Sequence, residues 1–257
     1  MTEPRRKRGR ERVYDAQRTR EAILSAAETV FAERGFDGTS VDAISSQAGY
    51  NKSLLFQYFG DKLGLYSQVL KRSDREMGEL MGHAFAEVSS GLADESVVLR
   101  AEEFRAFLVT MIQSIFDYLL EHPRLMRILT WEMAAGWKTF AEIASQFAPE
   151  DRSRATPLFQ RAREAGLLRS DFVPTIQFTM MVPWCQIYLG YLPLYQRLLP
   201  DEDLASASRL ADAREYLVDF VVAGMMESLP ETKTEKGVAD NVRGKINVSS
   251  KTRKRFI

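Results

Sequence analysis

Residues 39–59 have the sequence TSVDAISSQAGYNKSLLFQYF, which predicts two short helices separated by a tight turn. Thr39 and Asp42 have the Thr-x-x-Asp spacing of a capping box, so the first of these helices should begin there. Gly49 should end it, because glycine readily adopts the left-handed conformation that closes a helix. Asn51 is a good cap for the second helix. This spacing is typical of a helix-turn-helix.

The residues of this unit divide into an inward and an outward set. Small or apolar side chains fall where the helices must cross or face the preceding helix: Ala43, Ile44, Ala48, Leu54, Leu55 and Phe59. The side chains left to point outward are Tyr50, Asn51, Lys52, Ser53 and Gln57. The second helix of a helix-turn-helix enters the major groove of DNA with its N-terminal residues against base edges. Asn and Gln can pair with adenine, and Lys with guanine or phosphate. The alternative interpretation is three packed helices with ordinary polar surfaces.

Flanking helices complete this unit. Apolar residues between Arg18 and Arg34 recur with the 3.6-residue period of a helix, and Gly35 follows its last turn. Gly60 and Asp61 should end the helix-turn-helix and cap a further helix from about 62 to 88. The N-termini of the two short helices, near Ser40 and Asn51, offer free backbone N–H groups to phosphate.

Helical patterns continue almost to the end of the chain. We find no convincing alternating segment and no internal repeat, so the fold class is all-α in two parts. Pro123 suits the first turn of a helix, and Gly166 should end another. The remaining predicted helices span about 100–121, 124–135, 137–147, 151–165, 175–199 and 201–228.

Composition excludes several classes of protein. The chain has 257 residues, 45% of them hydrophobic and 27% charged, which is ordinary for a globular protein with a buried core. One cysteine, Cys185, excludes an intrachain disulfide and any multi-cysteine metal site, and the two histidines exclude an imidazole-rich one. We expect no metal and no cofactor. A glycine-rich phosphate loop and a nucleophile elbow are both absent from the sequence, so we predict no catalytic residues and no enzyme.

The charge is distributed unevenly although 35 basic and 35 acidic residues cancel. Residues 1–20 contain eight Lys/Arg and three Asp/Glu, and residues 230–257 again contain eight and three. Basic ends on an acidic body suggest that a polyanion is met locally. Residues 1–14 are predicted to be a flexible arm that can enter the minor groove, and 230–257 a basic disordered tail. Two solvated tails are the alternative.

One long uncharged segment, residues 172–196, could span a bilayer by its length alone. It contains three prolines and three glutamines, and a buried or interface helix that is apolar all round fits it better. The basic N-terminus is not followed by an apolar stretch of signal-peptide length. We therefore expect a cytoplasmic protein without a membrane partner.

Over residues 18 to about 70 the chain resembles the TetR family of bacterial transcriptional regulators. The resemblance lies in FAERGF at 31–36, in Thr39-Ser40-Val41, and above all in NKSLLFQYF at 51–59 followed by Asp61-Lys62. This run is much more specific than a generic helix-turn-helix. The resemblance implies a ligand-responsive regulator, most often a dimeric repressor released from a palindromic operator by a small molecule. The operator, the effector and the sign of regulation are not readable from the sequence.

Family roles transfer by position. Ser40 corresponds to a hydroxyl residue used on phosphate, Tyr50 to Ser53 to the base-reading start of the recognition helix, and Lys62 to a phosphate-binding lysine. Phe56, Gln57 and Tyr58 match the end of that helix, which grips the DNA backbone. Phe56 lacks the hydroxyl of the commoner tyrosine, and Leu54 replaces a small residue.

The resemblance also divides the chain into an arm (1–14), a DNA-binding domain (15–61), a ligand-binding and dimerisation domain (62–229) and a tail (230–257). It implies a homodimer through the last two long helices, with a buried intrachain helix as the alternative. It implies a cavity for a mostly apolar effector, although core packing explains the same residues. The candidate lining is Phe107, Met111, Gln113, Trp131, Glu132, Trp137, Gln177, Phe178, Met181, Trp184 and Tyr188.

A helical protein-interaction module without specific DNA recognition is the alternative function.

Overall fold

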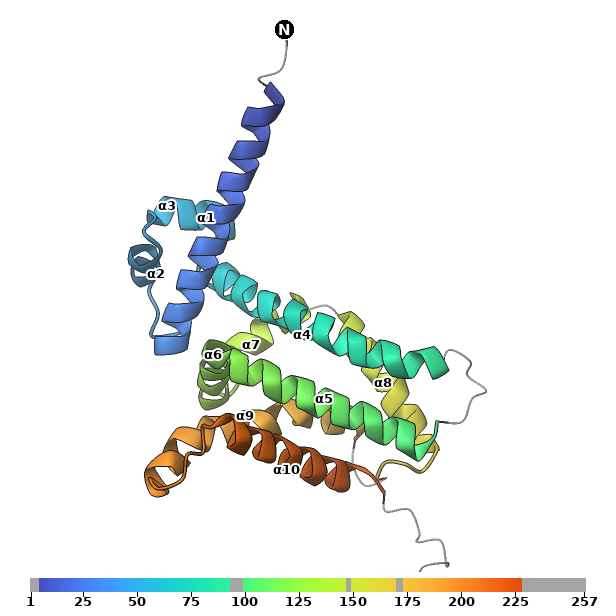
Figure 1. The fold of residues 1–257 in the computed structure, drawn as a ribbon. Helices are drawn as coiled ribbons and strands as arrows, with labels where there is room; N and C mark the ends of the chain where they lie inside the picture. The colour runs from blue at the N-terminus through green and yellow to red at the C-terminus, as the bar shows by residue number, and fades with distance from the viewer. Residues whose placement is uncertain (1–4, 93–98, 147–148, 170–172, 228–257) are drawn as a thin grey trace, which may run out of the picture.

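The computed structural model describes residues 5–92, 99–146, 149–169 and 173–227 (Figure 1). Within these ranges the fold is all-α, as predicted, and the only β contact is an isolated antiparallel bridge between Leu168 and Met226. The predicted tail over 230–257 lies outside the described residues. The helices are α1 (Arg5–Arg34), α2 (Val41–Ala48), α3 (Lys52–Phe59), α4 (Lys62–Leu92), α5 (Ala101–Glu121), α6 (Pro123–Ala134), α7 (Lys138–Ile143), the 3₁₀ helix η1 (Ala144–Gln146), α8 (Pro149–Glu164), α9 (Pro174–Leu198) and α10 (Ala207–Met225).

Helices α1, α2 and α3 form a small unit at one end of the molecule (Figure 1). Helix α2 packs on α1, and α3 lies against α2 and α4. Burying one large aliphatic or aromatic side chain contributes roughly 1.5–3 kcal/mol, so a few such residues suffice to hold the short helices on α1. The buried side chains of this unit include Ile23, Leu24, Ala27, Val30, Phe31, Ile44 and Leu55.

Helix α1 begins earlier than the sequence pattern predicted. Its backbone is helical from Arg5, where we expected a flexible arm over 1–14 and a helix from Arg18. The added residues are mostly Arg, Lys and Glu, which have high helix propensity, and extending an existing helix costs far less than nucleating one. This part of α1 projects away from the rest of the molecule in Figure 1.

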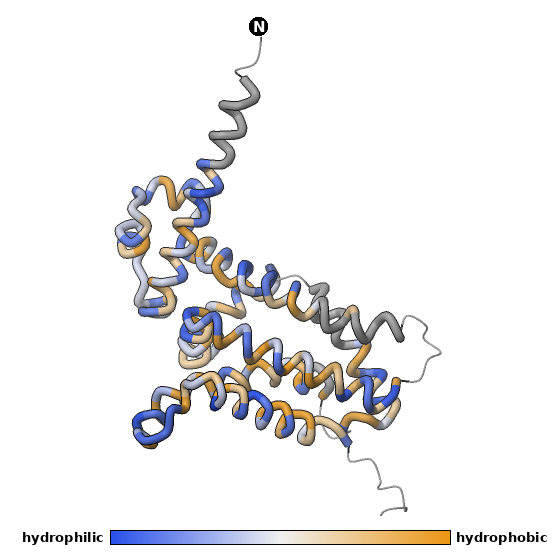
Figure 2. The backbone as a smooth tube through the Cα atoms, in the orientation of Figure 1, coloured by the Kyte–Doolittle hydropathy of each residue, from blue (hydrophilic) through white to orange (hydrophobic). Residues whose placement is uncertain are grey.

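The larger unit is built around α5, which packs against α4, α9 and α10. Helix α4 continues from the small unit into the larger one (Figure 1). Hydrophobic residues recur along α4, α5 and α10 in Figure 2, as expected of helices that share one core. The buried residues of α5 are Phe104, Phe107, Leu108, Met111, Ile112, Ile115, Phe116, Tyr118 and Leu119.

The last two helices run antiparallel and side by side, joined by a short loop. We predicted a helix from Asp201, but α10 begins only at Ala207. The side chain of Gln196 explains why α10 begins later. Its amide N–H donates to the Glu202 carbonyl at 2.5 Å, and its amide oxygen accepts from the Leu204 N–H at 3.0 Å. These bonds hold the connecting residues in turns.

Candidate nucleic-acid interface

The turn between α2 and α3 is fixed by local hydrogen bonds. Gly49 adopts a left-handed conformation (φ 72°), and its N–H donates to the Ser45 carbonyl at 3.0 Å. The Ser45 hydroxyl donates to the Tyr50 carbonyl. Asn51 caps α3, as predicted, by accepting from the Leu54 N–H at 2.9 Å.

The cap of α2 differs from the predicted capping box. Ser40, not Thr39, is the N-cap, and its hydroxyl oxygen accepts from the Ala43 N–H at 3.1 Å. Thr39 is buried and its hydroxyl donates to the Gly35 carbonyl at 2.6 Å. The helix therefore begins one residue later, since the Thr39 hydroxyl is engaged with the end of α1.

Helix α3 has one buried and one exposed face. Leu55 and Phe59 are buried, while Leu54 and Tyr58 are half-buried. The exposed residues are Asn51, Lys52, Ser53, Phe56 and Gln57, whereas Tyr50, which we expected to point outward, is half-buried. Phe56 leaves 47% of its surface accessible, unusual for a phenylalanine beside an otherwise polar face.

Two lysines of this unit have partners within the chain. Lys52 forms an ion pair with Asp42, and both side chains remain substantially exposed. The Lys62 ammonium donates to the carbonyls of Phe36 and Thr39 at 3.0 and 3.1 Å and lies 4.2 Å from the centre of the Phe36 ring. Lys62 thus fastens the start of α4 to the α1–α2 loop, a role that the sequence did not indicate.

Tyr66 on α4 connects the small unit to the larger one. Its ring contacts Phe31 and Phe36 edge-on, with centroids 4.8 and 5.1 Å away. Its hydroxyl donates to Glu132 Oε1 at 2.6 Å, while the Phe140 N–H donates to Glu132 Oε2 at 3.0 Å. Burial, followed by the bond to Glu132, raises the pKa of Tyr66 above its ordinary value.

Trp131 on α6 makes a second connection. Its indole N–H donates to the Ala32 carbonyl at 3.3 Å. Gly35 has a positive φ of 68°, and a Cβ there would approach the Trp131 ring to 3.1 Å. The sequence pattern indicated the helix-ending role of Gly35 but not this contact or the role of Tyr66, because the contact of Trp131 with Ala32 spans 99 positions and the bond of Tyr66 to Glu132 spans 66.

The predicted effector-lining residues do not surround one cavity. Phe107, Met111 and Met181 are fully buried in the core, and Phe178 packs edge-on against Phe159. Glu132 is 2% exposed, with both carboxylate oxygens accepting the hydrogen bonds described above.

The other predicted lining residues lie at several sites. Trp131 and Trp137 are exposed, Tyr188 is half-buried, and the Gln113 amide donates to Glu215 at 3.0 Å. Gln177 and Trp184 do line a common pocket. Several of the predicted lining residues are therefore part of the packed core, which was the alternative interpretation of these residues.

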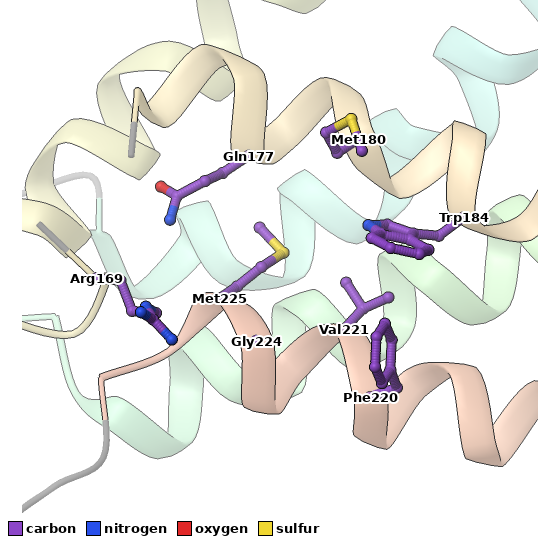
Figure 3. A pocket seen from close by; sticks show the side chains of 8 residues that line it. All are labelled: Arg169, Gln177, Met180, Trp184, Phe220, Val221, Gly224 and Met225. Atoms are coloured by element: carbon purple, nitrogen blue, oxygen red, sulfur yellow. The ribbon is translucent and has the colours of Figure 1, made fainter. Parts of the chain in front are cut away.

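The pocket that Gln177 and Trp184 share has a volume of about 370 Å³ and lies between α9 and α10 (Figure 3). Its other lining residues are Arg169, Met180, Phe220, Val221, Gly224 and Met225. A second pocket, of about 280 Å³, lies between the α1–α2 loop and helices α6 and α7.

Helices α9 and α10 also expose many large apolar side chains. Large apolar side chains exposed on two neighbouring helices indicate an interaction site when they gather on one face. The exposed residues are Val173, Ile176, Trp184, Ile187, Tyr191, Leu194, Tyr195, Leu198, Tyr216 and Phe220. Among the described helices, none is both long enough and apolar enough to cross a membrane.

Comparison with known proteins assigns both units. A model described as bacterial regulatory proteins, tetR family, matches residues 23–69, and a model described as tetracyclin repressor-like, C-terminal domain, matches residues 105–221. The HTH-type transcriptional repressor NicS of Pseudomonas putida is 29% identical over 83% of this chain and 95% of its own length. An HTH-type transcriptional repressor of Streptomyces coelicolor is 24% identical over 77% of this chain and 92% of its own length.

Solved structures support the fold. A TetR family transcription regulator from Marinobacter aquaeolei matches 85% of this chain and 100% of its own, with a TM-score of 0.59 and 21% identity. A second regulator structure, from a Shewanella species, matches 82% of this chain and 99% of its own, with a TM-score of 0.56 and 14% identity. The arrangement of the helices is therefore one that regulators of this type share.

Proposed function

Because this chain belongs to the TetR family of bacterial regulatory proteins, we propose that it is a dimeric repressor that binds a palindromic operator and is released by a small molecule. Members of this family are DNA-binding transcriptional regulators and not enzymes. The dimer, the operator symmetry and the ligand response are the proposed parts. We assign DNA binding to residues 15–61 and effector binding and dimerisation to residues 62–229.

The observation that carries the proposal is the exposed start of α3 on a rigidly capped turn. Asn51, Lys52 and Ser53 are exposed at the N-terminus of a helix whose opposite face is buried. Such a helix can enter a major groove without losing its packing, with its first residues against base edges. The Asn51 side-chain oxygen caps the helix, so its amide N–H groups remain the donors for base acceptors. Lys52 and Gln57 provide the longer reach to bases or phosphates.

Backbone phosphates are proposed to lie beside this helix. Ser40 uses its oxygen as a cap, and its hydroxyl hydrogen can still donate to a phosphate. Lys62 uses two of the three ammonium donors on carbonyls, which leaves one for a phosphate. Tyr50, Phe56 and Tyr58 border the same face. The basic residues 5–10 extend the positive charge along the projecting start of α1.

The proposed dimer uses the exposed apolar face of α9 and α10. A second copy would pair the same face with itself, which is the geometry of a two-fold interface, and would form a four-helix bundle. Two recognition helices related by this axis would meet half-sites about one DNA turn apart, roughly 34–36 Å. An effector in the larger unit would act through α4 and α6, because Tyr66 on α4 and Trp131 on α6 tie that unit to the helix-turn-helix.

The test begins with selection of bound duplexes from a random pool by the purified protein at near-physiological salt. Enrichment of an inverted repeat is the expected result and supplies the operator. No enrichment, with salt-sensitive binding to every sequence, would instead favour a helical interaction module with basic ends.

Variants then assign the surface. Lys52→Ala combined with Gln57→Ala should abolish specific binding of that operator while the dimer persists in sedimentation. The matched control removes the same residue types from the exposed surface of the larger unit, as Lys138→Ala combined with Gln160→Ala. Loss of dimerisation in the first variant would show that its residues are structural, and equal loss of binding in both would refute the assignment to α3.

A further inference from the structure

Helix α6 of the larger unit contacts α1 of the small unit at two separate points. Near the C-terminal end of α6, the Trp131 indole N–H donates to the Ala32 carbonyl at 3.3 Å. Near its N-terminal end, the Arg124 guanidinium lies 4.0 Å from the Glu28 carboxylate. One end of α6 is therefore held to α1 by a hydrogen bond between neutral groups, and the other by a contact between charges.

Glu28 is the point where charges from three helices meet. Its Oε2 accepts from Arg72 Nη2 of α4 at 2.7 Å, and the same oxygen faces Arg124 Nη1 of α6. Only 15% of the Glu28 side chain is accessible to solvent, compared with 22% for Arg72 and 53% for Arg124. Because water reaches this carboxylate poorly, its charge depends on the two guanidinium groups.

Arg72 holds α1 at a second point. Its Nη1 lies 3.7 Å from Glu21 Oε2, and Glu21 precedes Glu28 by two turns on the same face of α1. Arg20, the neighbour of Glu21, donates to the Gln68 side-chain oxygen of α4 at 2.7 Å. A side chain that binds two carboxylates two turns apart resists both sliding and rotation of α1 on α4.

We propose that Glu28 is a positioning residue whose ion pairs with Arg72 and Arg124 fix the angle of the helix-turn-helix on the larger unit. Helix α1 carries α2, which in turn carries α3, so any rotation of α1 against α4 and α6 moves the recognition helix. Figure 1 shows α4 continuing from the small unit into the larger one, with α6 beside the end of α1. The inference rests on the proposed function only for its consequence, the spacing of half-sites that a dimer accepts.

A joint made by charges differs from a packed joint in its response to salt. The Debye length falls from about 10 Å at 0.1 M salt to about 3 Å at 1 M, which weakens partly exposed ion pairs. The Trp131–Ala32 bond and the contact of the Tyr66 ring with Phe31 are between neutral groups and should persist. Salt should therefore free the helix-turn-helix to rotate about the C-terminal end of α6 without unfolding it.

The first test measures this freedom without DNA. Spin labels on Ser46→Cys in α2 and Ala106→Cys in α5, both exposed positions, report the distance between the two units, while the native Cys185 is buried. Labelled chains are diluted with unlabelled chains, so that only the intrachain distance is read. The wild type should give a narrow distribution at about 0.1 M salt that widens at about 1 M. Glu28→Gln should give a wide distribution at both, and a distribution as narrow as that of the wild type would overturn the proposal.

Further variants separate positioning from a general loss of stability. Glu33→Gln is the matched control, since Glu33 is an exposed carboxylate about 140° around α1 from Glu28, and it should keep the narrow distribution. Arg124→Met changes an exposed residue, so it remains informative even if Glu28→Gln fails to fold, and it should widen the distribution. Combined with Glu28→Gln it should add no further widening, because both changes remove one contact. Additive widening, or none in Arg124→Met, would refute the pairing with α6.

Operators with one base pair more or fewer between the half-sites test the consequence for DNA. The wild type should prefer the selected spacing, and Glu28→Gln should reduce this preference about fivefold while the preferred half-site sequence stays the same. An unchanged spacing preference would overturn the proposal even if the distance distribution widens. A widened distribution in a protein that selects no inverted repeat would refute the proposed function and leave the joint at Glu28 in place.

Discussion

The ion pair between Lys52 and Asp42 makes a direct prediction about DNA affinity. Lys52 is one of the residues proposed to read DNA, yet in the free protein its ammonium is bound to the carboxylate of Asp42 on the preceding helix. To reach a base or a phosphate, this ammonium must leave its partner. Asp42→Asn should therefore raise the affinity for the operator, because it removes a competitor that occupies the lysine before binding.

The size of this effect follows from the exposure of the pair. The Lys52 and Asp42 side chains are 48% and 69% accessible to solvent. Exposed ion pairs contribute about 0.2–1 kcal/mol. A dimer breaks two of them, for a total of about 0.4–2 kcal/mol, which corresponds to an affinity gain of about two- to thirtyfold.

The assay is a titration of labelled operator by fluorescence anisotropy at a fixed salt concentration, since affinities for DNA depend strongly on salt. Asp37→Asn is the matched control, because it removes an exposed carboxylate of the same unit that does not pair with Lys52, and it should change the affinity less than twofold. Asp42 lies in the first turn of α2, where losing its charge costs about 0.3–1 kcal/mol of stability, so thermal unfolding must show that the variant is folded. Unchanged or weaker binding by a folded Asp42→Asn variant would refute the reasoning.

Three further outcomes are expected. Tyr66→Phe leaves one buried oxygen of Glu132 without its donor, which should cost about 1.5–3 kcal/mol and lower the melting temperature by about 3–12 °C; an unchanged melting temperature would contradict this role of Tyr66. Burial, and then the charge of Asp117, raises the pKa of the Cys185 thiol to about 12. The stability that the buried neutral thiol contributes is therefore complete below about pH 9 and is lost as the pH rises toward 12. Between pH 9 and 10.5 the free energy of unfolding measured with urea should fall by about 2 kcal/mol more in the wild type than in the Cys185→Ala variant. An equal fall in both proteins would contradict the raised pKa of Cys185. Deleting residues 1–12 should weaken operator binding and flatten its dependence on salt, because fewer phosphates are neutralised; an unchanged slope would exclude these residues as DNA contacts.

Local signals predicted most of the helix-turn-helix. Gly49 and Asn51 end one helix and cap the next as the sequence indicated, since a left-handed glycine and a capping amide act within a few residues of their own position. The cap of α2 was misplaced by one residue because Thr39 bonds to the end of α1 instead. The start of α1 was misplaced further, since the basic segment has no apolar period to reveal a helix.

The lining of the pocket between α9 and α10 could not be predicted in the same way. Phe107, Met181 and Trp184 are all large apolar residues at helical spacing, yet the first two are core and only the third lines a pocket. The sequence pattern shows that a residue is apolar and on which face of its helix it lies. It does not show whether a neighbouring helix fills the space in front of it, which depends on how side chains distant in sequence interlock.

The all-α class and the helix-turn-helix were predictable because helix periodicity, caps and turn glycines act over a few residues, and the family was indicated by the resemblance of residues 51–62. What each polar residue inside the larger unit does depends instead on which distant segments pack against it. Glu132 and Gln177 both lie in apolar helical surroundings, and the sequence presents them as equivalent anchors. Packing gives both Glu132 oxygens a donor, from Tyr66 on α4 and from the backbone of α7, and gives the Gln177 oxygen none. Hydrogen bonds between distant segments thus distinguish a residue whose carboxylate is fully paired from one whose side-chain oxygen has no partner.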